Sequence, residues 1–242
     1  MMDPRIIAIN EHVKSIRNVI AVVSGKGGVG KSIISTIMAL QLSKMGYKVG
    51  LLDTDFTSPS THIILNAEEL TPKEDKGVIP PEIHGLKYMT ITYYTKDNPA
   101  PLRGIDVSNA LIELLSITRW GKLDYLIIDA PPGISDITLD LLRINWRIKF
   151  IVVATPSKLA LETVRKLIKL LEEQGGDIIG IIVNMVMGIE SIEYRSLGKR
   201  VLVEIPFQQD LEDKIGDVEE LLESMIGRKV KEALKLIVEE SP

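Results

Sequence analysis

Eight consecutive residues, at positions 25–32, have the types and the spacing that phosphate binding requires. They fit the pattern G-x-x-x-x-G-K-[ST], which closes with Gly30, Lys31 and Ser32. Glycines let a backbone curl until its N–H groups point inward at phosphate oxygens, while the lysine reaches the outer phosphates and the hydroxyl can bind Mg²⁺. We therefore predict a phosphate-binding loop. Its members are Gly25, Lys26, Gly27, Gly28, Val29, Gly30, Lys31 and Ser32.

The segments on either side of this loop have the character that would position it. Residues 19–24 form an apolar run typical of a strand that is buried on both faces. Residues 33–45 are typical of a helix, and the positive end of its dipole would face the phosphates. We expect the loop to join this strand to this helix.

The rest of the chain alternates between strand-like and helix-like runs. We expect strands at 47–52, 85–92, 123–128, 150–154, 177–183 and 201–205, and helices at 3–17, 60–66, 107–120, 137–145, 159–173, 208–225 and 228–239. The alternation predicts an α/β fold with a single doubly wound, mostly parallel sheet flanked by helices. Because no linker or repeat interrupts it, we expect one domain over 1–242, with an N-terminal helix in 1–17 and a C-terminal helix in 227–242.

Polar side chains follow three of the other expected strands. Asp53 and Asp55 come after the strand at 47–52, Asp129 follows 123–128, and Asn184 follows 177–183. In an open α/β sheet, active groups lie at the carboxyl ends of the strands. These side chains are therefore expected at the same edge of the sheet as the loop.

The three aspartates indicate metal and water chemistry. An aspartate after an apolar strand, far downstream of a phosphate loop, is typical of a residue that holds Mg²⁺ through water, and Asp129 fits this pattern. Asp53 and Asp55 have the chemistry to place a metal-bound water and to orient an attacking water. The alternative is that this pair caps the following element, and the residues alone leave both functions open.

The composition limits the classes of ligand. The 242 residues carry a formal net charge of −4, so no basic excess indicates nucleic-acid binding. Cysteine is absent, which excludes disulfides and thiolate-bound iron–sulfur clusters. The histidines at 12, 62 and 84 show no metal-ligand spacing. With neither a secretory signal nor a run approaching about 20 apolar residues, we expect a cytoplasmic protein with no membrane partner.

These motifs together resemble the MinD/ParA class of P-loop ATPases, and most of all its Mrp/ApbC branch. Lys26 is similar to the extra lysine of the deviant Walker A motif in that class. Further similar segments lie at 51–60 (switch I), 103–104, 123–136 (Walker B with switch II) and 154–165. The resemblance extends from about residue 17 to residue 216.

The resemblance implies a Mg²⁺-dependent ATPase that works as a homodimer with two ATP molecules between its subunits. Lys26 would reach the partner's nucleotide, Lys31 would contact the phosphates, and Asp55 would activate the attacking water. The implied metal-binding residues are Ser32, Asp53 and Asp129, and the implied adenine contacts are Asn184, Pro206 and Phe207. Conversion of ATP to ADP would be slow and stimulated by a client protein that the sequence does not name.

The chain departs from the Mrp/ApbC pattern in one segment. Relatives that carry iron–sulfur clusters place a Cys-x-x-Cys pair shortly after the strand that ends in the asparagine, whereas residues 187–194 contain no cysteine here. We therefore expect no cysteine-ligated cluster. The implied function is a carrier, scaffold or regulatory ATPase linked to iron–sulfur protein maturation only through another protein.

Two other functions stay open at the level of the sequence. A ParA/MinD-type positioning ATPase would bind DNA through the basic residues at 158–169 or membrane through the amphipathic tail at 228–240. The residues favour a solvated helix face and a packed helix at these two places. The other alternative is a binding module that holds ATP with little turnover.

Overall fold

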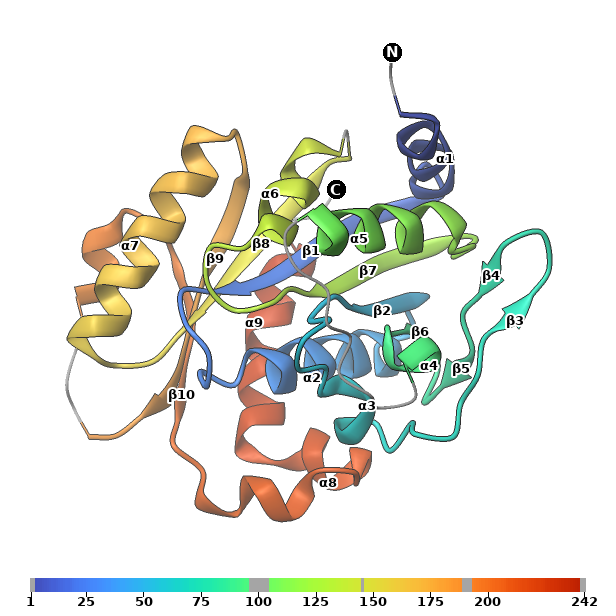
Figure 1. Cartoon of the computed structure of the whole chain (residues 1–242). Coiled ribbons are helices and arrows are strands. Elements are labelled where there is room, and N and C mark those ends of the chain that lie inside the picture. The colour runs from blue at the N-terminus through green and yellow to red at the C-terminus, as the bar shows by residue number, and fades with distance from the viewer. Residues whose placement is uncertain (1–2, 96–104, 145, 189–192, 240–242) are drawn as a thin grey trace.

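A central sheet carries the loop and the polar strand ends. The computed structural model describes residues 3–95, 105–144, 146–188 and 193–239 (Figure 1). In this part of the chain, eight strands form the sheet in the order β10–β9–β8–β1–β7–β2–β6–β5. Neighbouring strands run parallel, except that β5 and β6 are antiparallel. The predicted doubly wound, mostly parallel α/β fold is confirmed.

The elements have the following bounds. The strands of the sheet are β1 (Ile16–Ser24), β2 (Val49–Asp53), β5 (Glu82–Ile83), β6 (Leu86–Met89), β7 (Leu123–Asp129), β8 (Ile148–Ala154), β9 (Asp177–Val186) and β10 (Val201–Pro206). A separate hairpin pairs β3 (Lys73–Glu74) with β4 (Val78–Ile79). The α-helices are α1 (Pro4–Val13), α2 (Lys31–Lys44), α3 (Thr61–Ile64), α4 (Thr92–Thr95), α5 (Ile105–Ile117), α6 (Asp136–Arg143), α7 (Lys158–Glu173), α8 (Val218–Glu223) and α9 (Met225–Glu239). Two 3₁₀ helices are η1 (Glu193–Leu197) and η2 (Gln209–Lys214).

Helices cover both faces of the sheet. The helices α1, α5, α6 and α7 pack on one face, and α2, α3, α8 and α9 pack on the other (Figure 1). The side chains of β1 alternate between the two layers, with Ala21 and Val23 in the first and Ile20 and Val22 in the second. Burial on both faces explains why residues 19–23 of this strand form an unbroken apolar run.

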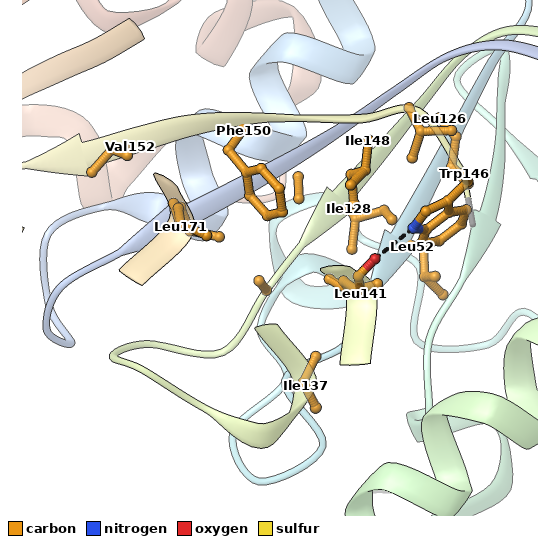
Figure 2. Close-up of a cluster of buried hydrophobic side chains, with 14 of the residues drawn as sticks. Leu52, Leu126, Ile128, Ile137, Leu141, Trp146, Ile148, Phe150, Val152 and Leu171 are labelled. Carbon is orange, nitrogen blue, oxygen red and sulfur yellow. Dashed lines mark hydrogen bonds between the residues drawn. The ribbon is translucent and has the colours of Figure 1, made fainter. Parts of the chain in front are cut away.

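Figure 2 shows part of the first layer, where α6 and α7 meet the sheet. Phe150 of β8 and Leu171 of α7 are fully buried in one cluster. The indole N–H of Trp146 donates a hydrogen bond to the carbonyl oxygen of Leu141 at 2.7 Å. A buried indole needs such an acceptor, and this one ties the start of β8 to the end of α6.

The predicted boundary between the first helix and the first strand is wrong. The helix ends at Val13 and β1 already begins at Ile16, because Ile16 pairs with Leu123 of β7. Its apolar side chain has helical spacing to the residues before it, so the local pattern assigned it to the helix. Pairing with a strand more than 100 residues away overrides that local signal.

The predicted helix at 208–225 is also wrong, because two short helices occupy this segment. Gly216 separates η2 from α8 with a φ of +88°, and Asp217 caps α8 by accepting a hydrogen bond from the Glu220 N–H at 3.0 Å. The hairpin β3–β4 and the strand β5 were not predicted. Positions 103–104, 145 and 189–192, which entered the sequence predictions, lie outside the described residues.

The last helix packs on the protein, as predicted. Val230, Ala233, Leu234 and Ile237 of α9 are buried, and the helix lies against α2 and β10. Its apolar face is therefore used inside the fold. Across the ranges that the structure describes, we find no helix whose length and apolar content would let it cross a bilayer.

Candidate functional site

A cavity of about 590 Å³ lies over the phosphate loop, at the carboxyl edge of the sheet. The loop supplies its floor, while the segment after β2, the segment after β7 and the region around η2 supply its walls. The lining residues are Ser24, Lys26, Gly27, Gly28, Val29, Gly30, Lys31, Ser32, Ile33, Asp55, Ser60, Ile63, Ile64, Pro132, Glu212 and Ile215. The predicted loop and Asp55 are thus brought together around one space.

The loop has the backbone shape that its glycines permit. It joins the end of β1 at Ser24 to the start of α2 at Lys31. Gly28 and Gly30 have φ angles of +72° and +81°, which side-chain-bearing residues rarely adopt. Because α2 begins directly after Gly30, its free N–H groups and the positive end of its dipole lie at the cavity.

Three donors converge on the carboxylate of Asp129 at the end of β7. Lys31 Nζ lies 2.6 Å from Asp129 Oδ1, Ser32 Oγ donates to Oδ2 at 2.7 Å, and Ser35 Oγ donates to Oδ1 at 2.8 Å. Lys31 is 6% exposed and Asp129 is 0% exposed, so this is a buried ion pair. The predicted residues Lys31, Ser32 and Asp129 therefore form one constellation.

Ser35 was not among the predicted site residues, although its spacing carried a signal. It lies three residues after Ser32 and four after Lys31, so a helix places all three on the same side. The oxygen atoms of Ser32 and Asp129 are the hard donors that Mg²⁺ prefers. The donor set at this point therefore fits that ion.

Asp53 serves as an anchor for α3. Its Oδ2 accepts hydrogen bonds from Thr61 Oγ1 at 2.6 Å and from the N–H groups of Ser60 and Thr61, both at 3.3 Å. Its Oδ1 accepts from the Asp55 N–H at 3.0 Å. This is the capping arrangement that the sequence left open, and Asp53 does not line the cavity. A direct role for Asp53 at Mg²⁺ stays a prediction.

The environment of Asp53 opposes its ionisation. Burial raises the pKa of the Asp53 carboxyl to about 7, and the nearby charge of Asp129 adds to the rise. The two residues are direct partners in the pairing of β2 with β7. Like charges held this close in a buried site favour the protonated form of one of them.

Asp55 presents its carboxylate to the cavity. Its Oδ1 accepts from Thr57 Oγ1 at 2.8 Å, from the Ser58 N–H at 3.1 Å and from the Thr57 N–H at 3.3 Å. Within the described part of the chain no residue donates to its Oδ2. Asp55 is therefore fixed through one oxygen while the other keeps its capacity to accept a proton or hydrogen bond from water.

Asn184 fixes the backbone of the phosphate loop through a side-chain hydrogen bond. Its side-chain amide donates to the carbonyl oxygen of Val29 at 2.9 Å, and the residue is 3% exposed. Pro206 ends β10, and Phe207 follows it with 47% of its surface exposed. None of these three residues lines the loop cavity, so their adenine contacts stay predictions.

Lys26 lies at the edge of the cavity and is half-buried. The Ser24 hydroxyl donates to its carbonyl oxygen at 2.9 Å, which fixes the backbone at this point. In the residues that the structure covers, its ammonium group forms no ion pair. This lysine is thus a cation at the cavity rim that remains available to another group.

The fold and this site define a P-loop NTPase. The family model of ParA, described as the NUBPL iron-transfer P-loop NTPase, matches residues 15–195. The chain therefore belongs to this family, and the predicted resemblance is confirmed.

Curated relatives carry one common name. An iron–sulfur cluster carrier protein of Rickettsia felis is 37% identical over 207 residues, which cover 83% of this chain and 65% of the relative. One from Aquifex aeolicus is 40% identical over 177 residues, which cover 72% of this chain and 49% of the relative. The chain thus spans about half to two thirds of the length of these two relatives.

Solved structures agree with the fold. The nucleotide-binding protein of Archaeoglobus fulgidus in complex with ADP aligns with a TM-score of 0.72 and 29% identity, over 94% of this chain and 92% of that protein. The septum site-determining protein MinD of Pyrococcus horikoshii, complexed with Mg-ADP, has a TM-score of 0.69 and 20% identity, over 92% of this chain and 96% of that one. The second likeness concerns the fold alone.

The contact between Gly30 and Asn184 predicts a difference between two alanine variants. Both Gly28 and Gly30 have positive φ, so either substitution costs about 1–2 kcal/mol in backbone strain. Only at Gly30 would the new Cβ meet a neighbour, 2.4 Å from Asn184 Nδ2. In urea unfolding without nucleotide, Gly30→Ala should lower the free energy of unfolding by about 1–3 kcal/mol more than Gly28→Ala.

A third variant tests the cause. In an Asn184→Ala background the clashing amide is gone, so the difference between Gly30→Ala and Gly28→Ala should disappear. A difference that persists in this background would show that the amide is not what excludes a side chain at position 30.

Proposed function

We propose that this protein binds MgATP in the loop cavity and hydrolyses it to ADP and phosphate. The proposal rests on one observation. Lys31, Ser32 and Asp129 meet at the point where the glycine-rich phosphate loop ends and α2 begins. The likeness to the ADP-bound protein of Archaeoglobus fulgidus supports a nucleotide as the ligand. Membership of a P-loop NTPase family supports hydrolysis.

Four side chains at the cavity or directly behind it would have distinct tasks in this reaction. The loop N–H groups and Lys31 would hold the phosphates, and Ser32 and Asp129 would hold Mg²⁺, which would supply neutralisation of the phosphate charge. Asp55 orients the attacking water through the oxygen that its own loop leaves open. Positioning and charge neutralisation provide most of the catalysis in phosphoryl transfer, so no covalent intermediate is needed.

The second part of the proposal is a homodimer that sandwiches two nucleotides. Lys26 supports it, because this cation has no partner carboxylate in the described residues and can act on the nucleotide of a second subunit, as an arginine finger does. Four exposed apolar side chains at the same edge of the sheet also support it. These are Ile134, Leu159, Met187 and Phe207, with exposed fractions of 52%, 79%, 71% and 47%, and we call them the apolar row.

The apolar row follows the order of the strands. Its members lie one to five residues after the ends of β7, β8, β9 and β10, and these strands flank β1 and its loop in the sheet. Large apolar side chains gathered beside a binding site are typical of a surface that another protein covers. A second subunit placed on this edge would bury them and bring its own Lys26 to the nucleotide.

The third part concerns the work that the nucleotide cycle performs. Because the relatives are named iron–sulfur cluster carriers, we propose a carrier, scaffold or regulatory function toward a client protein. The 242 residues supply no thiolate, so the chain would not hold a cysteine-ligated cluster of its own. Its contribution would be the change of surface shape between the ATP and ADP states.

Neither a membrane nor a DNA function has an observation in its favour. The apolar face of α9 is buried, so it does not form a membrane-binding surface. On α7, Arg165 pairs with Glu162 and Lys169 pairs with Glu173 along the same helix, which balances part of its positive charge.

Lys31→Ala should abolish nucleotide binding. Loss of a buried, hydrogen-bonded charge partner weakens binding by about hundredfold or more. Fluorescence titration with methylanthraniloyl-ADP and Mg²⁺ measures the loss. The matched control is Lys44→Ala, which should bind nucleotide as the wild type does. Lys44 lies at the far end of α2 and forms an exposed ion pair with Glu219. Lys31→Ala also leaves Asp129 without its charge partner, so a second variant, Lys31→Gln, is tested as well. Thermal melts of both variants check that the fold persists. Tight nucleotide binding by either variant would contradict the assigned site.

Lys26→Ala should separate binding from turnover. Affinity of the monomer for ADP should stay close to that of the wild type, whereas phosphate release should fall by roughly 10³-fold, the low end of a trans-acting finger. Lys48→Ala, an exposed lysine at the opposite edge of the sheet, is the control. Sedimentation of the ATP-bound Asp55→Asn protein measures the dimer directly, and a monomer under these conditions rules out the sandwich.

Anaerobic reconstitution with iron and sulfide should give no stoichiometric, stable iron–sulfur chromophore. Every usual cluster ligand is a thiolate, and this chain has none. Visible absorption after desalting, with bound iron and sulfide measured on the same sample, checks the result. A cysteine-bearing relative treated in parallel shows that the procedure works. One cluster per subunit or per dimer would refute the argument from composition.

A further inference from the structure

We infer that Ser35 is a positioning residue that keeps the Asp129 carboxylate in place when a nucleotide is bound. This inference rests on the proposed function, because it concerns the same MgATP site. It starts from the three donors on Asp129, which are Lys31, Ser32 and Ser35. These three differ in what else they must do.

Two of the donors have a second task. Lys31 and Ser32 belong to the phosphate loop and line the cavity, so a bound phosphate and Mg²⁺ compete with Asp129 for them. Ser35 lies one turn further along α2, is 0% exposed and does not line the cavity. Its bond to Asp129, at 2.8 Å, is the one that ligand binding leaves untouched.

The single proton of the Ser35 hydroxyl is free for this bond. Ser35 Oγ also lies 3.0 Å from the carbonyl oxygen of Ser32, which is the usual acceptor for a helical serine. That carbonyl already accepts the hydroxyl of Thr36 at 2.7 Å. A carboxylate is also the stronger acceptor, so the Ser35 proton goes to Asp129.

The effect of losing this hydroxyl depends on the ligand. Without nucleotide, Asp129 would still have Lys31 and Ser32. With nucleotide and Mg²⁺ both bound, Lys31 turns to the phosphates and Ser32 to the metal, so in the variant the buried Asp129 carboxylate would lose its last side-chain donor among the described residues, which is costly and lets the group rotate. Asp53, its pairing partner in β2, directs its carboxyl oxygens to Thr61 and to the Asp55 N–H rather than to Asp129. The defect should therefore appear in the Mg²⁺-dependent part of nucleotide binding.

The experiment compares Ser35→Ala with Thr36→Val. Both variants remove one buried hydroxyl from neighbouring positions of α2, but only Ser35 touches Asp129. Binding of methylanthraniloyl-ADP is titrated with Mg²⁺ and, separately, in EDTA. For Ser35→Ala we expect half-saturation at about tenfold higher Mg²⁺, with affinity in EDTA within about twofold of the wild type. Thr36→Val should match the wild type in both titrations.

A Ser35→Cys variant tests whether the strength of the donor at position 35 sets the Mg²⁺ dependence. Ser35→Cys, of similar shape but a weak donor, should fall between the wild type and Ser35→Ala. An unchanged Mg²⁺ dependence in Ser35→Ala, or an equal shift in Thr36→Val, would overturn the inference while the proposed function stands. Equal losses with Mg²⁺ and in EDTA would indicate a purely structural effect and would also overturn it. A wild type that binds no ADP would overturn both.

Discussion

The ion pair between Lys31 and Asp129 is the constraint around which the site is arranged. Two opposite charges removed from water carry a desolvation cost that their attraction offsets only with good geometry and further hydrogen bonds. Ser32 and Ser35 supply those bonds, and all four groups come from two elements, the start of α2 and the end of β7. The Asp129 carboxylate thus pairs with the same lysine that would contact phosphates in the proposed function. A phosphate that bound there would replace one anion by another, so the buried lysine would keep a counter-charge.

The same strand end also controls the wall of the cavity. The Thr54 N–H and hydroxyl both donate to the Asp129 carbonyl, at 2.9 Å and 2.8 Å, which locks the end of β2 to the end of β7. From there Asp53 caps α3, whose Ile63 and Ile64 line the cavity. Hydrogen bonds therefore join the end of β7, the end of β2 and α3 into one wall beside the phosphate loop.

The parts of the site that could be predicted are those whose signals are local. The loop, Lys31 and Asp129 were predicted because an apolar strand, a turn and a helix adjoin one another in the sequence. The capping contact of Asp53 was one of two alternatives that the sequence left open, whereas the contact of Asn184 could not be predicted, because Asn184 holds the loop from a strand 155 positions away. Helical spacing places Ser35 on the same side of α2 as Lys31 and Ser32. The sequence does not show that Asp129 faces that side, so the spacing alone could not identify Ser35 as a site residue. Long-range pairing likewise decided where β1 begins.

The apolar row has a mechanical consequence, because its members lie in segments that leave four strands of one sheet, and the sheet sets where those segments begin. Neighbouring strands lie about 4.8 Å apart, so the four spacings from β10 to β7 fix the strand ends within a span of roughly 19 Å. Such a surface is preorganised, and a protein that docks on it would lose little conformational entropy from this side. The phosphate loop emerges from β1 inside that span. Any partner that matches the fixed spacing would be seated directly over the nucleotide, so recognition and control of the site would share one template.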